Sequence, residues 1–258
     1  MLAHLVQKSL SVSLDRSGTM LRGLFHLVYP PTCAHCHVQT LTQNALCSDC
    51  WSTLRLIERP FCEVLGLPFA HDPGEGMLSP EAIAHPPVFD RLRSVALHEG
   101  VARHLVHGLK YRDRTDLAPM MAAWMVRAAS AEIAAADGIV AVPLHRMRMF
   151  RRMFNQSAEL ARHVGRQAGK PFFAEALVRR KRTQQQVGLT ANQRALNVRG
   201  AFLVPEGREE LVFGRRLVLI DDVYTTGATV GAATAALKKA GAADVTVLTF
   251  ARALSGPI

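Results

Sequence analysis

Apolar residues along the C-terminal two thirds of the chain follow two alternating patterns. Short apolar runs predict buried strands, whereas apolar residues three or four positions apart predict helices. The expected strands are 138–142, 217–220 and 245–250, and the expected helices are 104–110, 117–135, 157–167 and 230–240. The last strand, helix and strand predict a βαβ unit, and therefore an α/β fold with a parallel sheet flanked by helices. The sequence shows no internal repeat, Walker A loop or G-x-G-x-x-G fingerprint.

The N-terminal third follows a different pattern. Apolar residues at helical spacing between Met20 and Val28 predict a short amphipathic helix within a segment 1–28. Prolines and glycines between residues 68 and 88 predict a loop and a boundary. We therefore expect three parts, which are a helical segment at 1–28, a small module with its linker at 29–88, and the α/β domain at 89–258.

The small module contains two pairs of cysteines. Cys33-x2-Cys36 and Cys47-x2-Cys50 are separated by ten residues. Four thiolates at this spacing can surround one tetrahedral Zn²⁺, and such a closed site is structural rather than catalytic. A pair of disulfides is the alternative, but it needs an oxidising compartment and nothing in the sequence indicates export. The histidines on either side of Cys36 could replace a thiolate, although four cysteines suffice.

The composition is that of a globular chain. The 258 residues are 49% hydrophobic and 20% charged, which fits one sizeable core with a small appendage. No run of about 18 uncharged apolar residues is present, and the first residues lack the apolar core of a secretory signal. We therefore expect no membrane-spanning segment and a cytoplasmic protein.

The positive charge is concentrated in one segment. The whole chain has a net charge of +10, and residues 142–199 contain 13 Lys or Arg but only 2 Asp or Glu. This concentration favours an anionic partner at a local site, either pyrophosphate or nucleic acid. A solvated basic surface is the alternative.

The residues after the expected strand 217–220 carry the most specific chemistry. Two carboxylates follow the strand and precede a turn of small and hydroxyl residues where a helix begins. The carboxylates are Asp221 and Asp222, and the turn contains Thr225, Thr226, Gly227, Ala228 and Thr229. A helix N-terminus attracts phosphate through its N–H donors, while carboxylates accept hydrogen bonds from vicinal hydroxyls and can orient hydrated Mg²⁺. The pattern predicts a ribose 5-phosphate site at the sheet edge, with an ordinary acid-capped turn as the alternative.

A basic loop follows the expected strand 138–142. It contains histidine, arginine and amide side chains that can hold phosphate oxygens. They are His145, Arg146, Arg148, Arg151, Arg152, Asn155 and Gln156. Because a guanidinium can bind two oxygens at once, this loop favours a pyrophosphate group.

The stretch 217–229 resembles the phosphoribosyl pyrophosphate (PRPP) motif of type I phosphoribosyltransferases, although Tyr224 stands where an aliphatic residue is usual. Together with the paired cysteines, the chain resembles the ComF family, which is associated with competence and DNA uptake and includes GntX-like proteins. The resemblance implies a type I phosphoribosyltransferase fold behind a zinc module. It also implies PRPP with Mg²⁺ as ligand, with the two acids on the ribose hydroxyls and the Thr/Gly turn on the 5-phosphate.

Two further stretches resemble the ComF pattern near the expected ligand. Residues 152–156 are similar to R-G-F-N-Q, with Met153 in place of Gly, in the loop that meets the pyrophosphate. Residues 109–113 are similar to L-K-Y-R-G, with Asp113 in place of Gly. Their Lys110 and Arg112 either face the anionic ligand or cap the C-terminus of the preceding helix.

The basic stretch 179–202, which contains Gln186 and Arg194, resembles the mobile catalytic loop of these transferases. Closure of such a loop would exclude water from a charged reaction centre.

A second pair of cysteine knuckles, beginning C-x-x-C-G-x-P, follows in many ComF proteins. This chain keeps Cys62, Gly66 and Pro68 at the matching positions but has Leu65 at the second cysteine, and no cysteine comes later. The resemblance therefore implies that the second metal site has been lost and that Cys62 is a buried thiol.

Three hypotheses for function follow. The first is a phosphoribosyltransferase in which Asp221 and Asp222 stabilise a cation-like sugar and Arg151 and Arg152 steady the leaving pyrophosphate. The second is a non-catalytic module that senses PRPP or binds single-stranded DNA and DNA-uptake proteins, with mainly phosphate contacts. The third is a regulatory domain that the zinc module docks to another protein. No nucleobase pocket is evident in the sequence, so no acceptor is assigned.

Overall fold

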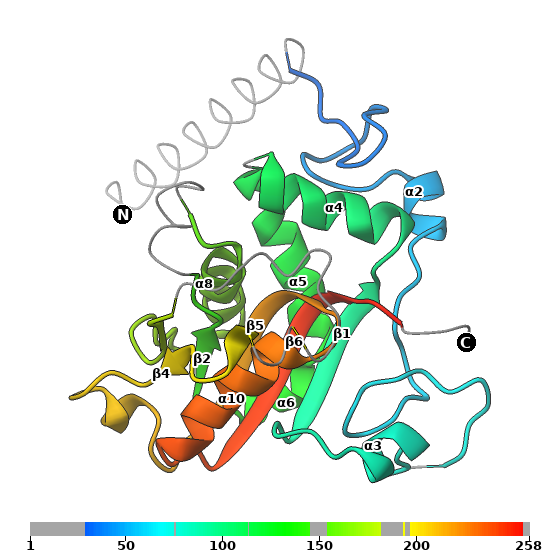
Figure 1. Ribbon diagram of the computed structural model, residues 1–258. Coiled ribbons are helices and arrows are strands. Elements are labelled where there is room, and N and C mark those ends of the chain that lie inside the picture. Colours follow the sequence, from blue (N-terminus) through cyan, green and yellow to red (C-terminus); the bar gives the residue numbers. More distant parts are fainter. Residues whose placement is uncertain are drawn as a thin grey trace, which may run out of the picture. The chain divides into compact units, whose positions relative to one another are not determined.

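The computed structural model describes residues 29–74, 76–112, 114–144, 154–181, 193 and 197–254 (Figure 1). The predicted helical segment 1–28 lies outside these residues, as do Arg151, Arg152, Gln186 and Arg194. The chain forms two compact units, Met1–Trp51 and Ser52–Ile258, and each is described by itself. Residues 52–88 belong to the unit that contains the sheet.

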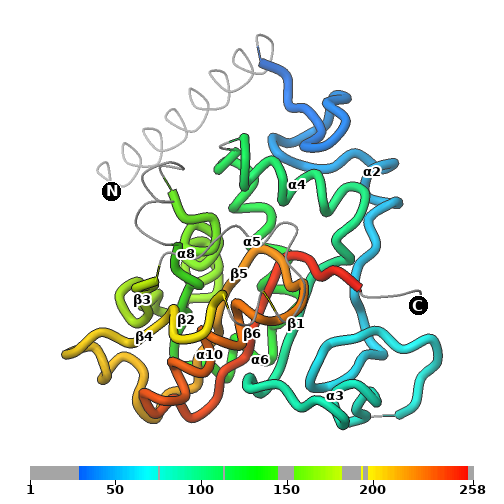
Figure 2. The backbone as a smooth tube through the Cα atoms, in the orientation of Figure 1, coloured from blue at the N-terminus to red at the C-terminus, as the bar shows by residue number. Residues whose placement is uncertain are grey.

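A four-stranded parallel sheet forms the centre of the second unit, and Figures 1 and 2 show the course of the chain through it. Its strands are β1 (Arg91–Leu97), β2 (Gly138–Ala141), β5 (Arg216–Tyr224) and β6 (Asp244–Arg252). Their order is β1-β6-β5-β2, and all three pairings are parallel. Beyond β2, Ile139 makes one further parallel bridge to Phe172. The predicted α/β fold with a parallel sheet is therefore confirmed.

Helices cover both faces of the sheet. They are α4 (Gly100–Tyr111), α5 (Ala118–Ala128), α6 (Ser130–Ala135), α8 (Gln156–Ala168) and α10 (Ala228–Lys239). α5 and α8 pack together on one face, and α10, which connects β5 to β6, lies on the other (Figure 1). None of the helices in the described part of the chain has the length and apolar content needed to cross a membrane.

Short elements complete the described part of the chain. They are α2 (Ser48–Ser52), α3 (Pro80–Ala84), the 3₁₀ turns η1 (Thr115–Leu117) and η2 (Glu209–Leu211), and an antiparallel pair of β3 (Val178–Arg179) with β4 (Phe202–Leu203).

The core lies on both faces of the sheet. Every residue of β2 is buried, and β6 is buried from Val245 to its end. Strands that are covered on both faces have continuous apolar sequences rather than alternating ones. This is why the runs 138–142 and 245–250 were detectable as strands.

Two predicted elements differ from those observed. The single helix expected over 117–135 is divided at Ala129, which leaves the helical conformation between α5 and α6. Ala129 is fully buried, so the apolar pattern continues across the break and cannot mark it. The strand expected at 217–220 continues to Tyr224 because its ladder with β6 runs past Asp221 to the pair Tyr224–Arg252.

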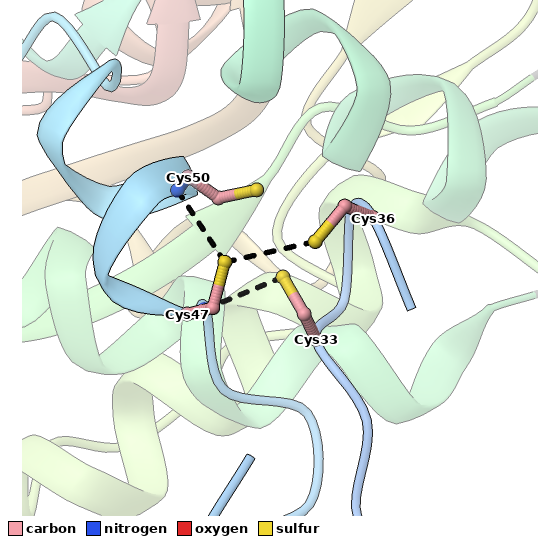
Figure 3. Close-up of side chains that lie close together, drawn as sticks. All are labelled: Cys33, Cys36, Cys47 and Cys50. Carbon is pink, nitrogen blue, oxygen red and sulfur yellow. Dashed lines mark hydrogen bonds between the residues drawn. The ribbon is translucent and has the colours of Figure 1, made fainter. Parts of the chain in front are cut away.

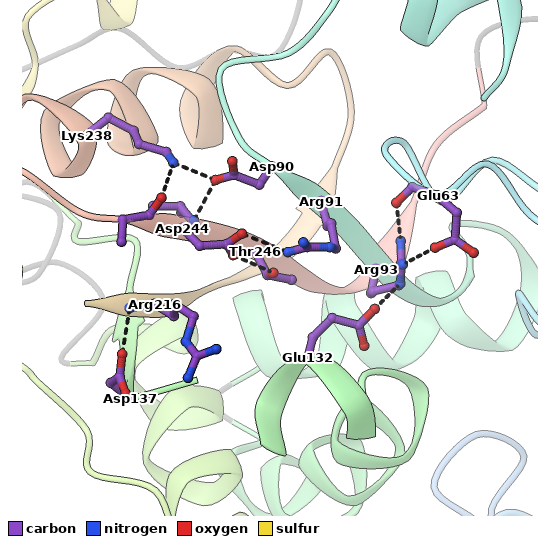
Figure 4. A network of polar contacts seen from close by, with 12 residues as sticks. Glu63, Asp90, Arg91, Arg93, Glu132, Asp137, Arg216, Lys238, Asp244 and Thr246 are labelled. Carbon is purple, nitrogen blue, oxygen red and sulfur yellow. Dashed lines mark hydrogen bonds and ion pairs between the residues drawn. The ribbon is translucent and has the colours of Figure 1, made fainter. Parts of the chain in front are cut away.

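A buried arginine attaches the segment before β1 to the sheet (Figure 4). The Arg93 side chain is only 4% exposed, and it forms ion pairs with Glu63 at 2.9 Å and with Glu132 of α6 at 2.6 Å. Its Nη1 also donates to the carbonyl oxygen of Glu63 at 2.9 Å. One guanidinium therefore holds the 60–69 segment, β1 and α6 together.

We predict that Arg93→Ala lowers the free energy of unfolding by about 3 kcal/mol, because it leaves two carboxylates without their shared cation. The matched control is Arg91→Ala on the same strand, because the Arg91 side chain, which pairs with Asp244, is 44% exposed. This control should lower the free energy of unfolding by less than about 1 kcal/mol. Urea denaturation of the zinc-loaded chains measures both, and equal losses would contradict the assigned role of Arg93.

Candidate functional site

Two adjacent carboxylates lie near the carboxyl end of β5. Asp221 pairs with Thr249 in the ladder to β6, and Asp222 is 6% exposed. The backbone N–H of Asp222 donates to Asp221 Oδ1 at 3.0 Å. The sheet therefore places both acids at the edge where open α/β sheets bind ligands.

Lys110 is the cation that faces this pair. Its Nζ lies 2.9 Å from Asp222 Oδ2 and 3.3 Å from Asp222 Oδ1. The Lys110 ammonium is thus held at the acid pair, and its contact with an anionic ligand stays a prediction. Arg112 instead is the exposed C-cap residue of α4, and its backbone N–H donates to the carbonyl oxygen of Gly108 at 3.1 Å.

The first residues of α8 connect three elements around the acids. Asn155 is the N-cap residue, and its Oδ1 accepts from the N–H of Ser157 at 3.1 Å. Its Nδ2 donates to the carbonyl oxygen of Val142, just after β2, at 3.2 Å. The Gln156 amide donates to the carbonyl oxygen of Lys110 at 3.3 Å. Both amides therefore hold the backbone around the site.

Ser157 is a site residue that sequence reasoning missed. Its hydroxyl donates to Asp221 Oδ1 at 2.8 Å, and the residue is 5% exposed. Serine is common near helix N-termini for local reasons, so its presence there does not indicate a long-range contact. Its position directly after Asn155 and Gln156, which the pattern did single out, was the available signal.

The two acids and the lysine form one coupled electrostatic group. Burial, and then the neighbouring Asp222 carboxylate, raise the pKa of Asp221 to about 7, against the opposing effects of Lys110 and Ser157. Burial alone would lower the pKa of Lys110, but the carboxylates of Asp222 and Asp221 outweigh it and raise that pKa. A single ammonium therefore does not fully compensate the two adjacent carboxylates, of which Asp222 is buried and Asp221 half-buried.

The turn after β5 leads directly into α10. Gly227 is the N-cap residue of this twelve-residue helix and has φ of +75°. A Cβ atom at this position would lie 2.7 Å from the Tyr224 hydroxyl oxygen, so a side chain here would be both strained and crowded. Thr225 and Thr226 are exposed, and Ala228 and Thr229 are partly buried. The hydroxyls and the positive end of the helix are thus combined as the sequence predicted.

The second cluster consists of the four cysteines predicted to bind metal, in the first unit (Figure 3). The sulfur atoms of Cys33, Cys36, Cys47 and Cys50 all lie within 4.8 Å of one another, and Cys36 Sγ and Cys47 Sγ are 3.6 Å apart. A tetrahedral Zn²⁺ with bonds of about 2.3 Å separates its sulfur ligands by about 3.8 Å. The residues present therefore fit a structural zinc ion.

The surroundings of the cysteines favour thiolates with a cation between them. Burial alone would raise the pKa of Cys33, but the N–H groups of Cys36, Cys47 and His35 lower it to about 6. Burial and the other three sulfurs raise the pKa of Cys50. Four thiolates at this distance can be ionised together only around a cation such as Zn²⁺. His35 Nδ1 lies 3.4 Å from Cys50 Sγ, beside the cluster rather than in place of a cysteine.

The structure thus brings the predicted residues together in two groups. The first contains Asp221, Asp222, Lys110 and Gln156, and the second contains the four cysteines. The predicted phosphate turn 225–229 continues from the strand that carries the acids.

Two family models match the chain. A double zinc ribbon domain matches residues 24–82, and a phosphoribosyl transferase domain matches residues 155–258. The second match contains α8, the two acids and the turn before α10. The N-terminal four-cysteine zinc module and the phosphoribosyltransferase domain predicted from the sequence are therefore confirmed.

Bacterial relatives match nearly the whole chain. The DNA utilization protein YhgH of Escherichia coli (strain K12) is 32% identical over 235 residues, which cover 88% of this chain and 100% of the relative. YhgH of Salmonella typhimurium gives the same identity and coverage. Competence protein F of Haemophilus influenzae is 26% identical over 227 residues, which cover 86% of this chain and 96% of the relative.

We predict that Asp221→Asn stabilises the ligand-free chain more at pH 8 than at pH 6. The folded-state pKa is raised from 3.8 to about 7, so the stability of the wild type falls as pH rises through this interval. An asparagine carries no charge and avoids this loss. Most of the loss lies below pH 7, so the gain of the variant over the wild type should grow by about 1 kcal/mol between pH 6 and pH 8.

Urea denaturation at pH 6, 7 and 8 checks this prediction, because the zinc contribution cancels in the difference from wild type. Asp244→Asn is the control, since its ion pair with Arg91 is partly exposed. A stability difference for Asp221→Asn that does not grow with pH would contradict the prediction.

Proposed function

Because the chain belongs to the ComF family of the DNA utilization protein YhgH and competence protein F, we propose that its phosphoribosyltransferase domain binds PRPP with Mg²⁺ in a role linked to DNA uptake or utilisation. The observation that carries the proposal is the succession of two adjacent acids, one half-buried and one buried, and a glycine-capped helix at the carboxyl end of β5. The acids and the helix N-terminus attract opposite charges, so they suit the two ends of a sugar phosphate.

The two parts of the site would bind different parts of the ligand. Asp221 and Asp222 would accept hydrogen bonds from the ribose hydroxyls and orient the hydrated Mg²⁺. Residues Thr225 to Thr229 would hold the 5-phosphate at the positive end of α10. A carboxylate repels a phosphate, so the acids favour the end of the ligand that carries hydroxyls and the metal.

Lys110 would take part in the same site. In the ligand-free chain its ammonium lies on Asp222. A bound Mg²⁺ would supply the acids with positive charge, and the ammonium could then contact the pyrophosphate. Arg151 and Arg152 follow β2 in the sequence, and we propose the same role for their guanidinium groups. We propose that Arg112, Asn155, Gln156, Gln186 and Arg194 contribute further contacts to the ligand.

Transfer of the phosphoribosyl group is the catalytic form of this proposal. The reaction would break the bond from the sugar to pyrophosphate and pass through a cation-like sugar, which the nearby carboxylates stabilise electrostatically. A sensor that binds PRPP without turnover would use the same contacts, so ligand binding is the property to test first.

Binding to single-stranded DNA is a second proposed function. The relatives are named for DNA utilization and competence, and the segment 142–199 has 13 basic and 2 acidic residues. Only a few aromatic residues lie in this segment, so base stacking would contribute little and phosphate contacts would dominate.

We predict that PRPP raises the melting temperature only when Mg²⁺ is present. Ligand at about 100 times its Kd stabilises a protein by about 2.7 kcal/mol, which corresponds to about 5–10 °C for a chain of this size. Asp221→Asn, Asp222→Asn and the double variant should lose this shift, whereas Asp244→Asn, at the opposite end of the sheet, should keep it. An unchanged shift in the double variant would contradict the proposed site.

For DNA, we predict that affinity for a single-stranded oligonucleotide falls steeply between 50 and 200 mM salt, because phosphate contacts release bound counterions. Fluorescence anisotropy with a labelled oligonucleotide measures this dependence. Affinity that is constant over this salt range would exclude a phosphate-driven DNA site.

A further inference from the structure

Two turns in the N-terminal part of the chain have the same backbone hydrogen bonds. In the first, Cys33 N–H donates to Val38 O at 2.7 Å, and His37 N–H donates to Cys33 O at 3.1 Å. In the second, Cys62 N–H donates to Leu67 O at 2.8 Å, and Gly66 N–H donates to Cys62 O at 2.7 Å. Each residue of the second turn is 29 positions after its counterpart.

The similarity extends to both sides of the turns. An antiparallel bridge joins the residues on either side of each turn, Thr32 with Gln39 in the first and Phe61 with Pro68 in the second. The residue four positions after each cysteine has positive φ, 63° at His37 and 57° at Gly66. The second turn is therefore built like the first, metal-binding one.

A short helix follows each of the two turns and completes the segment to which the turn belongs. α2 and α3 both have five residues, and α3 begins 32 positions after α2. The residue before each helix donates its N–H to the first cysteine sulfur, from Cys47 to Cys33 Sγ at 3.3 Å and from Ser79 to Cys62 Sγ at 3.2 Å. These matching bonds place Ser79 at the position of Cys47.

The fourth position follows in the same way. Cys50 N–H donates to Cys47 Sγ at 3.5 Å, and Ala82 N–H donates to Ser79 Oγ at 3.3 Å. In the second segment, the four positions that match the metal ligands Cys33, Cys36, Cys47 and Cys50 are thus Cys62, Leu65, Ser79 and Ala82. The expectation of no internal repeat is therefore wrong. Three of the four cysteines that would mark the repeat are replaced, and only the match of Cys62, Gly66 and Pro68 to a second pair of knuckles remains in the sequence.

These four residues do not fit a zinc ion. Leu65 and Ala82 have no donor atom in their side chains, and a serine hydroxyl is not among the usual zinc ligands in proteins. Cys62 Sγ accepts hydrogen bonds from the N–H groups of Leu65 at 3.4 Å and Ser79 at 3.2 Å. The thiol thus satisfies backbone donors rather than a metal.

Burial against the sheet takes the place of the metal. Cys62, Leu65, Ser79 and Ala82 are all between 0% and 6% exposed, and all but Ser79 belong to one hydrophobic cluster with Leu92 of β1 and Val247 of β6. Leu92 N–H donates to Val64 O at 2.8 Å, and Arg252 of β6 donates to Leu65 O. A Cβ atom on Gly66 would lie 2.5 Å from Leu92 O, so the turn rests directly on the backbone of β1.

We infer that residues 60–84 are a metal-free zinc ribbon that the sheet stabilises, and that the chain binds one zinc ion rather than the two that a double ribbon implies. The first ribbon keeps four cysteines and needs its metal. The second keeps the backbone of a ribbon but replaces the metal by apolar contacts with the sheet.

Zinc content per folded chain tests the inference, measured by mass spectrometry of the metal after purification in zinc-containing medium and removal of loosely bound ions. The wild type should contain one zinc ion, Cys36→Ser should lose it, and Cys62→Ser should keep it. Two zinc ions in the wild type, or loss of zinc in Cys62→Ser, would overturn the inference.

Restoring the missing ligands provides a second test. The variant Leu65→Cys/Ser79→Cys/Ala82→Cys should bind two zinc ions, and Co²⁺ substitution should double the absorbance typical of tetrahedral thiolate sites. A folded variant that still binds one ion would refute the ligand positions assigned here. If the variant does not fold, Co²⁺ titration of the wild type decides, since saturation at one equivalent supports the inference and saturation at two contradicts it.

Discussion

The parallel ladder between β5 and β6 is the constraint on which the candidate site depends. It continues through Asp221–Thr249 to Tyr224–Arg252, so the backbone that carries the acids is held by the sheet. Thr249 is in turn bonded to Ser94 of β1, with their hydroxyl oxygens 2.7 Å apart. Only three residues separate the end of β5 from α10, which fixes the acids and the helix N-terminus close to each other. Rigid placement of this kind suits a site that binds a ligand at two ends.

The N-terminal part of the chain illustrates two ways to stabilise the same small ribbon. A ribbon of this size has too few apolar residues for a core of its own, so it needs either a metal or a neighbouring surface. The first ribbon uses four thiolates, of which the one on Cys36 is exposed. The second ribbon packs against the sheet, and ion pairs of the buried Arg93 add to its apolar contacts. Once the sheet supplies the free energy of stabilisation, the remaining metal ligands are no longer required.

Much of this architecture was predictable because it depends on local patterns. Apolar runs marked strands that are buried on both faces, and cysteine spacing marked the zinc cluster. The break at Ala129 and the contact of Ser157 with Asp221 were not predictable in this way. The contact of Ser157 is tertiary, since it joins residues distant in the sequence. Of the second ribbon, the sequence kept Cys62, Gly66 and Pro68 as a trace, but the short helix and its hydrogen bonds to Cys62 Sγ became visible only in the structure.

The electrostatics of the acid pair limit what can bind there. Lys110 provides one positive charge for two carboxylates, and burial, followed by the neighbouring Asp222, raises the pKa of Asp221 to about 7. An anionic group placed on the acids would add to the repulsion, whereas a divalent cation or a pair of hydroxyl donors would relieve it. Under the proposed function, the phosphate groups therefore bind away from the acids, the 5-phosphate at the positive end of α10 and the pyrophosphate at basic residues that follow β2 in the sequence. PRPP carries its hydroxyls between two such groups, which is why this separation of charge supports PRPP as the proposed ligand.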